Sequence, residues 1–327
     1  MATLPDGKIP IALLRELIAS KTPLPPEVVV GPGFGEDACV IDLPAGSLVA
    51  TTDPITLTGK EVGAHAVQIN ANDVAVTGVR PRYFLACVLL PRGTDEATAR
   101  TLFAQMRGAL DVVGAALVGG HTEVTAAVSQ PIVIGQMLGH CESGAHLRTG
   151  GVRPGDAILQ IGPAPVEGAA VLAAELTDRL GAVPAAVLER AASAIAAPGI
   201  SVVEPALLAA AFGALALHDP TEGGLSTGLH ELAEASGVAL EVDADAVLWF
   251  EPGRAIANAL GLDPWGILAS GTLLAAFPAE RAGEARAALE AEGYAVARIA
   301  TAATGDRVRS GNGPLPRFER DELSRVL

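Results

Sequence analysis

The sequence predicts two domains of mixed α/β (or α+β) class. Three observations predict this fold class. First, the chain has 327 residues, enough for two domains of roughly 150 residues each. Strand-like and helix-like segments alternate in both halves. A turn-rich segment at 150–156, Gly-Gly-Val-Arg-Pro-Gly-Asp, separates the halves. We therefore predict an N-terminal domain over 1–150 and a C-terminal domain over 151–327.

The N-terminal half begins with a predicted amphipathic helix over 8–20, which a proline-rich break ends. The spacing of apolar residues then predicts a glycine turn and two strands, a helix, a buried strand, a second helix and two more strands. The predicted strands cover about 38–42, 47–52, 83–90, 115–118 and 131–138, and the predicted helices cover about 62–77 and 95–113.

The C-terminal half alternates in the same way, although the order of strands within a sheet does not follow from the pattern. The predicted strands cover 157–161, 238–242, 267–276 and 294–300, and the predicted helices cover 166–178, 184–196, 202–213, 222–236, 252–260 and 279–292. Residues 307–327 indicate a polar, loosely structured tail with a short terminal helix.

Composition excludes several classes of protein. No apolar run approaches the roughly 20 residues of a membrane span, and the first ten residues lack a signal-peptide pattern. Three widely spaced cysteines favour a reduced, cytoplasmic protein without a disulfide framework. The net charge of −15 disfavours nucleic acid and anionic membranes as partners. A phosphate ligand would therefore be held by metal ions, backbone amides and a few local cations.

Three acids stand at the edges of short apolar elements. Asp37 follows the glycine turn that contains Gly33 and Gly35, Asp53 follows the strand over 47–52, and Asp73 follows Asn72 in a helical pattern. Carboxylates gathered at one place repel each other unless a cation lies between them, and hard oxygen ligands suit Mg²⁺. The stretch predicts a metal–nucleotide site, with an ordinary loop and surface acids as the alternative.

A second candidate segment is Gly119-Gly-His-Thr-Glu123, directly after a predicted strand. A tight turn there would bring the amides of Gly119 and Gly120 near a ligand. His121 could contact a phosphate or act as a general base, and Glu123 could bind a metal. The alternative is a solvated loop.

The third candidate segment is Leu217-His-Asp-Pro-Thr-Glu-Gly-Gly-Leu225. Asp219 is predicted to be an N-cap, with Pro220 at the first helical position. The amides of Gly223 and Gly224 would then face an anion at the helix start. The alternative is a capped helix without a ligand.

Seven short motifs together resemble the superfamily of aminoimidazole ribonucleotide (AIR) synthase, which has the PurM-like fold. They follow the family's order over nearly the whole chain: Gly35-Glu-Asp-Ala38, Thr51-Thr-Asp53, Asn72-Asp73 with Gly78-Val-Arg-Pro81, Gly119-Gly-His-Thr122, Pro154-Gly-Asp156, Asp219-Pro-Thr-Glu-Gly-Gly-Leu225 and Ala269-Ser-Gly-Thr-Leu273.

This resemblance implies an N-terminal sheet that forms a barrel across a homodimer, a C-terminal α/β domain, and Mg·ATP bound near the dimer interface. Asp37, Asp53 and Asp73 match the family's metal-binding acids. His121 stands where the family usually carries an acid after the two glycines, so Glu123 is the candidate for a substitute ligand. Lys60, the only lysine near the predicted site, is a candidate catalytic residue.

The motifs at 219–225 and 269–273 are most similar to the HypE branch, which matures hydrogenases. Thiamine-monophosphate kinases tend to carry Ser-Asp-Gly-Leu instead, and that sequence is missing. HypE proteins end in Pro-Arg-x-Cys, whose thiol carries the carboxamide that is dehydrated. No cysteine follows Cys141 here, so we do not expect dehydration on the chain's own tail.

The resulting hypothesis is an ATP-dependent enzyme that phosphorylates an amide, formyl or related oxygen on a small-molecule or protein-borne substrate. Two alternatives stay open at this point. One is a small-molecule kinase similar to thiamine-monophosphate kinase, and the other is a nucleotide-binding maturation partner with little catalysis.

Overall fold

The computed structural model describes residues 28–30, 35, 39–43, 45–56, 61–311 and 313–327. The chain divides into two compact units, one ending at His146 and the other running from Leu147 to the last residue. Gly35 belongs with the second unit, although in sequence it lies between two segments of the first. The helix expected over 8–20 lies outside the described residues.

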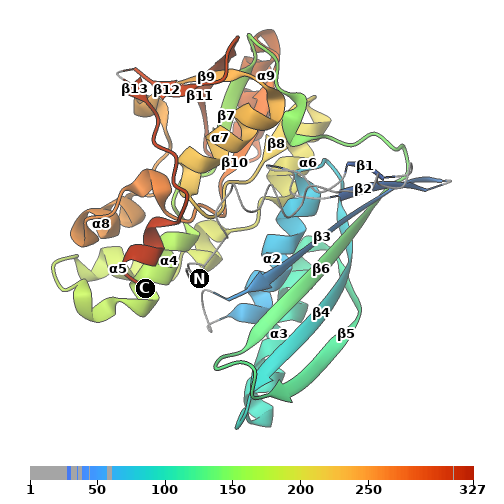
Figure 1. Cartoon of the computed structure of the whole chain (residues 1–327), viewed down its shortest axis with the longest axis vertical. Helices are drawn as coiled ribbons and strands as arrows, with labels where there is room; N and C mark the ends of the chain where they lie inside the picture. Colours follow the sequence, from blue (N-terminus) through green and yellow to red (C-terminus); the bar gives the residue numbers. More distant parts are fainter. Residues whose placement is uncertain (1–27, 31–34, 36–38, 44, 57–60, 312) are drawn as a thin grey trace, which may run out of the picture. The chain divides into compact units, whose positions relative to one another are not determined.

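The first unit is a six-stranded sheet with two helices on one face (Figure 1). Its strands lie in the order β1-β2-β3-β6-β4-β5, and all neighbours are antiparallel except β4 and β5. The strand bounds are Val28–Val30, Cys39–Leu43, Gly46–Ile55, Pro81–Pro91, Ala116–Thr125 and Ile132–Cys141 for β1 to β6, and the helices are α2 (Val62–Ala75) and α3 (Glu96–Val113).

Alternation along the strands explains how this sheet buries one face. In β4, Phe84, Ala86 and Val88 are buried, whereas the residues between them are only half-buried. The buried side chains face α2 and α3, whose Val74 and Met106 are also inaccessible to solvent. A strand with period-two burial lies on a helix layer in this way.

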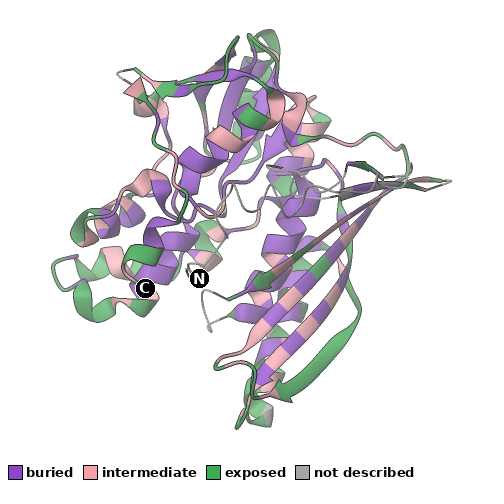
Figure 2. Ribbon diagram, in the orientation of Figure 1, coloured by how far each residue is buried: buried purple, intermediate pink, exposed green. Residues whose placement is uncertain are grey.

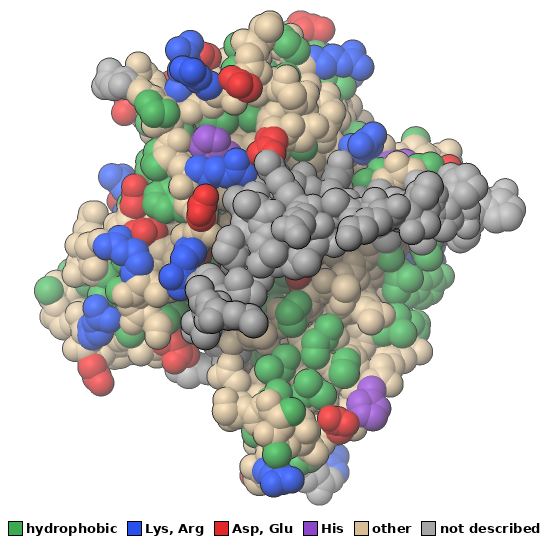
Figure 3. Space-filling view, viewed as in Figure 1, with side chains coloured by type: hydrophobic (Ala, Val, Ile, Leu, Met, Phe, Trp, Pro, Cys, Tyr) green, Lys and Arg blue, Asp and Glu red, His purple; other side chains and the backbone are tan. Residues whose placement is uncertain are grey.

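The other face of the sheet is apolar, and neither described helix of this unit lies over it. Leu48, Leu85, Ile134 and Leu138 point to that face by alternation and are half-buried. The edge strand β5 is exposed along almost its whole length (Figure 2). Hydrophobic side chains gather over this unit in Figure 3.

The second unit is a seven-stranded sheet with helices around it. Its order is β13-β12-β9-β11-β7-β10-β8, and all pairs are antiparallel except β12 with β9. The strands are β7 (Ala157–Ile161), β8 (Ala216–His218), β9 (Ala239–Val242), β10 (Leu273–Phe277), β11 (Val296–Ala303), β12 (Val308–Ser310) and β13 (Gly313–Pro314).

Six α-helices belong to the described part of this unit: α4 (Glu167–Glu175), α5 (Ala185–Ala192), α6 (Val203–Ala211), α7 (Gly224–Ser236), α8 (Glu251–Leu260) and α9 (Ala279–Ala291). Helix α7 carries Leu225, Leu229 and Leu232 into the main core, where they meet strand residues such as Ile158 and Leu274. The spacing of these leucines at i, i+4 and i+7 is that of one buried helix face.

Most predicted helices and strands are confirmed, with shifted ends. The turn predicted at Gly119–Glu123 is wrong, because these residues continue β5 in parallel register with β4. The strand β8 was not predicted, and β10 begins later than the expected strand over 267–276. The tail over 307–327 is not loose: it forms β12, β13 and a short 3-10 helix, Glu322–Arg325.

No single helix among the described residues is long and apolar enough to cross a membrane. One bent pair of helices, 185–192 with 195–211, passes the same test of length and composition.

Candidate nucleotide and metal site

Two of the predicted metal-binding acids, Asp53 and Asp73, lie on elements of the first unit that pack against each other. Thr51 and Asp53 lie on the face of β3 that packs on α2. The Thr51 hydroxyl donates to Asp73 Oδ2 of α2 over 2.7 Å. Asp73 is 6% exposed, and burial of a carboxylate without such partners is costly. The strand–helix packing therefore brings the elements of Asp53 and Asp73 together.

Asn70 joins the same two elements one turn earlier on α2. Its Oδ1 accepts from the Asp53 backbone amide over 2.9 Å, and its Nδ2 donates to the Asp53 carbonyl over 3.2 Å. Nδ2 also donates to the Ala66 carbonyl, and Asn70 is completely buried. These two hydrogen bonds to the backbone of one residue fix Asp53 near the end of β3. Asn72, which was predicted to bind the nucleotide, is also fully buried on α2.

Gly135 of β6 lies opposite Asp53 and lets Asn70 approach the sheet. A Cβ on Gly135 would stand 2.5 Å from Asn70 Nδ2 and 2.8 Å from the Phe84 ring. The Thr52 hydroxyl donates to the Gly135 carbonyl over 2.7 Å. A glycine is therefore required at position 135, where the buried side-chain amide of Asn70 lies against the strand.

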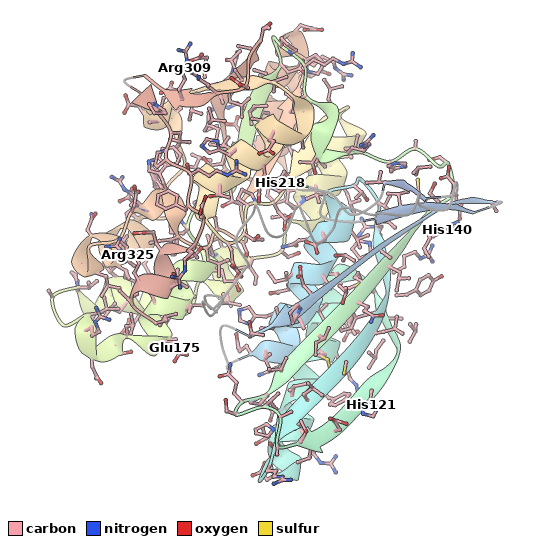
Figure 4. The ribbon with its side chains drawn as sticks, viewed as in Figure 1. His121, His140, Glu175, His218, Arg309 and Arg325 are labelled. Carbon is pink, nitrogen blue, oxygen red and sulfur yellow. The ribbon has the colours of Figure 1, made fainter. Side chains whose placement is uncertain are left out.

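His121 and Glu123 form a pair on the edge strand β5. His121 Nε2 lies 3.3 Å from Glu123 Oε2, and the two side chains are 64% and 48% exposed. Figure 4 shows His121 on the outermost strand of this sheet. An exposed pair of this kind stabilises the fold very little.

The strand register separates this pair from Asp53. Asp53 pairs with Gly135, Gly135 with Ala86, and Ala86 with Gly120. Three steps between neighbouring strands amount to about 14 Å, whereas two ligands of one Mg²⁺ lie at most about 4 Å apart. Within one chain, Glu123 and Asp53 are thus not brought to a common ion.

The two glycines of β5 allow the strand to approach β4 rather than forming a turn. Gly120 has φ +144°, and a Cβ there would overlap the Ala86 carbonyl oxygen. The pairing slips by one residue just before Gly119, which is a bulge in the strand. A hollow of about 320 Å³ lies beside this bulge, lined by Phe103, Leu117 and the segment 119–122.

In the second unit, the predicted anion site at the start of α7 is filled by the chain itself. The Gly223 amide donates to Asp321 Oδ2 over 2.9 Å, and the Gly224 amide donates to the Thr221 carbonyl over 3.0 Å. Helix α7 begins at Gly224, so the N-cap is Gly223 and not Asp219. The capping prediction was wrong because both glycines have positive φ, which delays the first helical turn.

Asp321 is unusual among the acids of this unit. It is 9% exposed, and burial raises its pKa from 3.8 to about 7. The amides of Leu323 and Gly223 lower the pKa in part, whereas the nearby Glu222 and Glu167 raise it further. The group is thus partly protonated near neutral pH.

A second buried pair adjoins Asp219. His218 Nε2, at the end of β8, lies 2.9 Å from Glu231 Oε2 of α7, and His218 is 2% exposed (Figure 4). Asp219 is 2% exposed as well. Gly35 rests on the same helix, where an added Cβ would lie 3.3 Å from the Glu231 carbonyl oxygen. Gly35, from the predicted glycine turn, and the 217–225 segment therefore both adjoin α7.

The remaining predicted site residues, Gly33, Asp37 and Lys60, lie outside the described residues. Among the residues that the structure describes, no three His, Cys, Asp or Glu side chains are grouped closely enough to hold a metal. The carboxylates of Asp53 and Asp73 and the Thr51 hydroxyl are hard oxygen donors of the kind Mg²⁺ uses. They are of the donor type that the predicted magnesium site requires.

Comparisons with known proteins identify the family. Residues 35–141 match the N-terminal domain of AIR synthase related proteins, and residues 153–311 match the C-terminal domain. The carbamoyl dehydratase HypE of Azotobacter vinelandii is 33% identical over 253 residues, which are 75% of this chain and 72% of that protein. The chain belongs to the AIR synthase-related family. Within it, the chain is HypE-like.

Further HypE proteins support this assignment. The carbamoyl dehydratase HypE of Rhodobacter capsulatus is 31% identical over 301 residues, which cover 87% of this chain and 82% of that protein. A solved hydrogenase maturation protein HypE, in complex with ATP, superimposes with a TM-score of 0.74 at 27% identity. That likeness covers 88% of this chain and 90% of the solved one. The PurM-like, two-domain fold expected from the sequence is thereby confirmed.

Several site residues of this HypE-like chain were not found from the sequence. Asn70 and Glu231 lie in helices, and only the fold shows that they bond Asp53 and His218. Asp321 lies in a polar tail about 100 residues from Gly223 in sequence, and no local pattern connects them. The one available signal was an Asp-Glu pair just before the predicted terminal helix, which is typical of a helix start.

Proposed function

We propose that this AIR synthase-related chain is a Mg·ATP-dependent enzyme that phosphorylates an amide- or formyl-type oxygen on a small-molecule or protein-borne acceptor. The observation that carries the proposal is the buried junction of β3 and α2, where Thr51 orients Asp73 beside the strand end at Asp53. An ATP complex of a HypE structure that is 27% identical supports ATP as the nucleotide.

Asp53 and Asp73 would hold Mg²⁺, with Asp37 as the third carboxylate. When bound, the metal neutralises charge on the phosphate oxygens during phosphoryl transfer. The protein's part is positioning: Thr51 holds one oxygen of Asp73, and Asn70 holds the backbone on both sides of Asp53. Pre-organised ligands of this kind need little rearrangement when the nucleotide binds.

The Gly223 amide at the start of α7 could bind a phosphate of the nucleotide only after Asp321 of the C-terminal tail had moved away from it. The Gly223 amide donates to Asp321, so a phosphate would have to take the place of that carboxyl group. His121 remains the candidate general base, held by Glu123 on the open edge of β5. Because the register keeps His121 away from Asp53 of the same chain, His121 would have to serve the site of a second copy in the proposed homodimer.

The open apolar face of the first unit supports a homodimer as part of this proposal. Leu48, Ile134 and Leu138 form an apolar surface that no described helix of the first unit covers. A second copy would offer the same face, as a symmetric dimer requires. Leu138→Arg should make the protein monomeric in light scattering, whereas Val112→Arg, on exposed α3, should leave the dimer intact.

Following the labelled γ-phosphate of ATP tests the proposed reaction and distinguishes it from a small-molecule kinase and from a non-catalytic partner. The protein is incubated with γ-labelled ATP, Mg²⁺ and formamide or a primary amide as acceptor. We expect labelled free phosphate that depends on both Mg²⁺ and the amide. A stable labelled acceptor would instead support a small-molecule kinase. Nucleotide binding without any turnover across an acceptor panel would support a non-catalytic partner.

A matched pair of variants links that activity to the site. Asp73→Asn removes the buried carboxylate charge, whereas Asp111→Asn makes the same change on the exposed side of α3. Only the first variant should lose Mg²⁺-dependent phosphate release.

A further inference from the structure

The second unit has a hollow of about 780 Å³ at the edge of its sheet. Strand β9, the β12–β13 hairpin and α7 border it, and the label of Arg309 on β12 marks its place in Figure 4. A hollow of this size is in the range of small-molecule sites. Its polar lining consists of His230, Glu241, Asp306, Arg307 and Arg309, and none of these residues belongs to the proposed nucleotide or magnesium site.

The shortness of β13 leaves this hollow open. Strand β13 has two residues, and its last residue, Pro314, lies opposite Arg309. The Leu315 amide then donates to the Val308 carbonyl over 3.0 Å, and His230 Nε2 of α7 donates to the Leu315 carbonyl over 3.0 Å. The chain thus leaves the sheet toward α7, and β13 does not extend along the start of β12.

One of the two arginines in the hollow has a partner, whereas the other is free. Arg309 Nε and Nη2 each lie 2.7 Å from Glu241 Oε1, so the charges of this pair cancel. Arg307 and Asp306 are exposed, and neither side chain forms a hydrogen bond or ion pair with a described residue. A guanidinium stays charged at any working pH, and its planar set of donors matches a carboxylate or phosphate. The described lining therefore offers a free cation and a free carboxylate.

His230 adds a neutral hydrogen-bond acceptor to the hollow. A carbonyl oxygen can only accept, so the ring proton is on Nε2, which bonds Leu315. Burial lowers the pKa of this imidazole, the bond to the Leu315 carbonyl and the charge of Glu231 raise it in part, and Arg317 lowers it further. The ring is therefore mainly neutral at pH 7, and its Nδ1 can accept a hydrogen bond. In the part of the chain that the structure describes, no donor bonds to that atom.

We propose that this hollow binds a small molecule that carries an oxyanion, phosphate or carboxylate, next to a hydrogen-bond donor, hydroxyl or ammonium. Arg307 binds the oxyanion, while Asp306 and His230 Nδ1 accept from the donor. An exposed arginine alone needs no ligand, but here a free cation and two free acceptors line one hollow. An anion without a donor would be repelled by the Asp306 carboxylate and should bind more weakly. Binding requires neither ATP nor Mg²⁺, so this site goes beyond the proposed function.

Calorimetric titration of the full chain, without nucleotide, tests this site with three compounds. Glycerol 3-phosphate supplies a phosphate with hydroxyls, glycine supplies a carboxylate with an ammonium, and sulfate supplies an oxyanion without a donor. We expect saturable binding of glycerol 3-phosphate or glycine, and the compound that binds more tightly identifies the oxyanion. Sulfate should bind at least about tenfold more weakly than that compound.

A matched pair of variants connects the binding to the hollow. Arg307→Gln should weaken it by about tenfold or more, because a charge-assisted bond to the oxyanion is lost. Arg190→Gln removes the same charge from the exposed side of α5 and should leave the affinity unchanged. Both arginines are exposed, so both variants should keep the wild-type Tm.

The Cε1–Hε1 NMR signal of His230 gives a second readout. It should move along the calorimetric binding curve in the wild-type protein, and it should move much less in Arg307→Gln at the same ligand concentration. Four results would overturn the site: no saturable binding of either compound, equally tight binding of sulfate, an equal loss in Arg190→Gln, or binding that leaves the His230 signal unmoved.

Discussion

The two units hold their buried acids with different hydrogen-bond donors, a side-chain hydroxyl in the first unit and backbone amides in the second. Asp73 accepts from the Thr51 hydroxyl, close to where a second acid, Asp53, is held at the end of β3. Asp321 accepts from the backbone amides of Gly223 and Leu323. The first arrangement is the one proposed to bind a cation, whereas the second places a carboxyl group where amides suit an anion. The comparison sets the proposed cation site beside a helix start that the chain's own carboxyl group occupies.

The largest expected effect concerns the start of α7. Gly224 has φ +69°, and an added Cβ would meet the Trp265 carbonyl oxygen and stand 2.8 Å from Ile267 N. We expect Gly224→Ala to lower the free energy of unfolding by about 4 kcal/mol, measured in urea. Gly237→Ala, at the other end of α7 with φ +67° and nothing within 4 Å, should cost only about 1 kcal/mol. Equal costs would show that the start of α7 is not closely packed.

The next prediction compares the two acids themselves. Asp73→Asn should weaken Mg²⁺-dependent ATP binding about 100-fold in calorimetry, because a metal ligand loses its charge. Asp321→Asn should leave the Mg²⁺ dependence intact, since that carboxyl lies on backbone amides. Loss of Mg²⁺ dependence in Asp321→Asn would erase the distinction between the two sites.

The smallest expected effect tests the support of Asp73. Thr51→Val leaves a buried carboxylate without its hydroxyl donor, so the free energy of unfolding should fall by about 1–2 kcal/mol. Thr52→Val removes a bond from an exposed hydroxyl to the Gly135 carbonyl and should cost about 0.5 kcal/mol. A larger loss in Thr52→Val would mean that the Thr51 bond does not stabilise Asp73.

The sequence allowed most elements to be predicted, because local patterns specify them. The predicted strand over 157–161 and the helix over 95–113 agree with β7 and α3 to within one residue. Asp95 accepts from the Thr98 amide and Gly114, with φ +72°, ends α3, so both ends of this helix carry local signals.

Long-range contacts explain what could not be predicted. Two glycines in sequence indicate a turn, but Gly119 and Gly120 serve parallel pairing with β4, which no nearby residue reveals. The roles of Asn70 and Asp321 likewise depend on partners from other elements. The motif spacing predicted Asp53 and Asp73 in one region, and the packing of β3 on α2 confirms that their elements meet.

Thermal unfolding with nucleotide tests the central claim most directly. The chain is heated with ATP and Mg²⁺, with ATP and a chelator, and with AMP and Mg²⁺. At 100 times its Kd, a ligand adds about 2.7 kcal/mol, which raises the Tm of a chain of this size by about 4 °C. The account predicts that shift in the sample with ATP and Mg²⁺ and in neither of the other two samples. An equal shift without Mg²⁺, or none with any nucleotide, would contradict it.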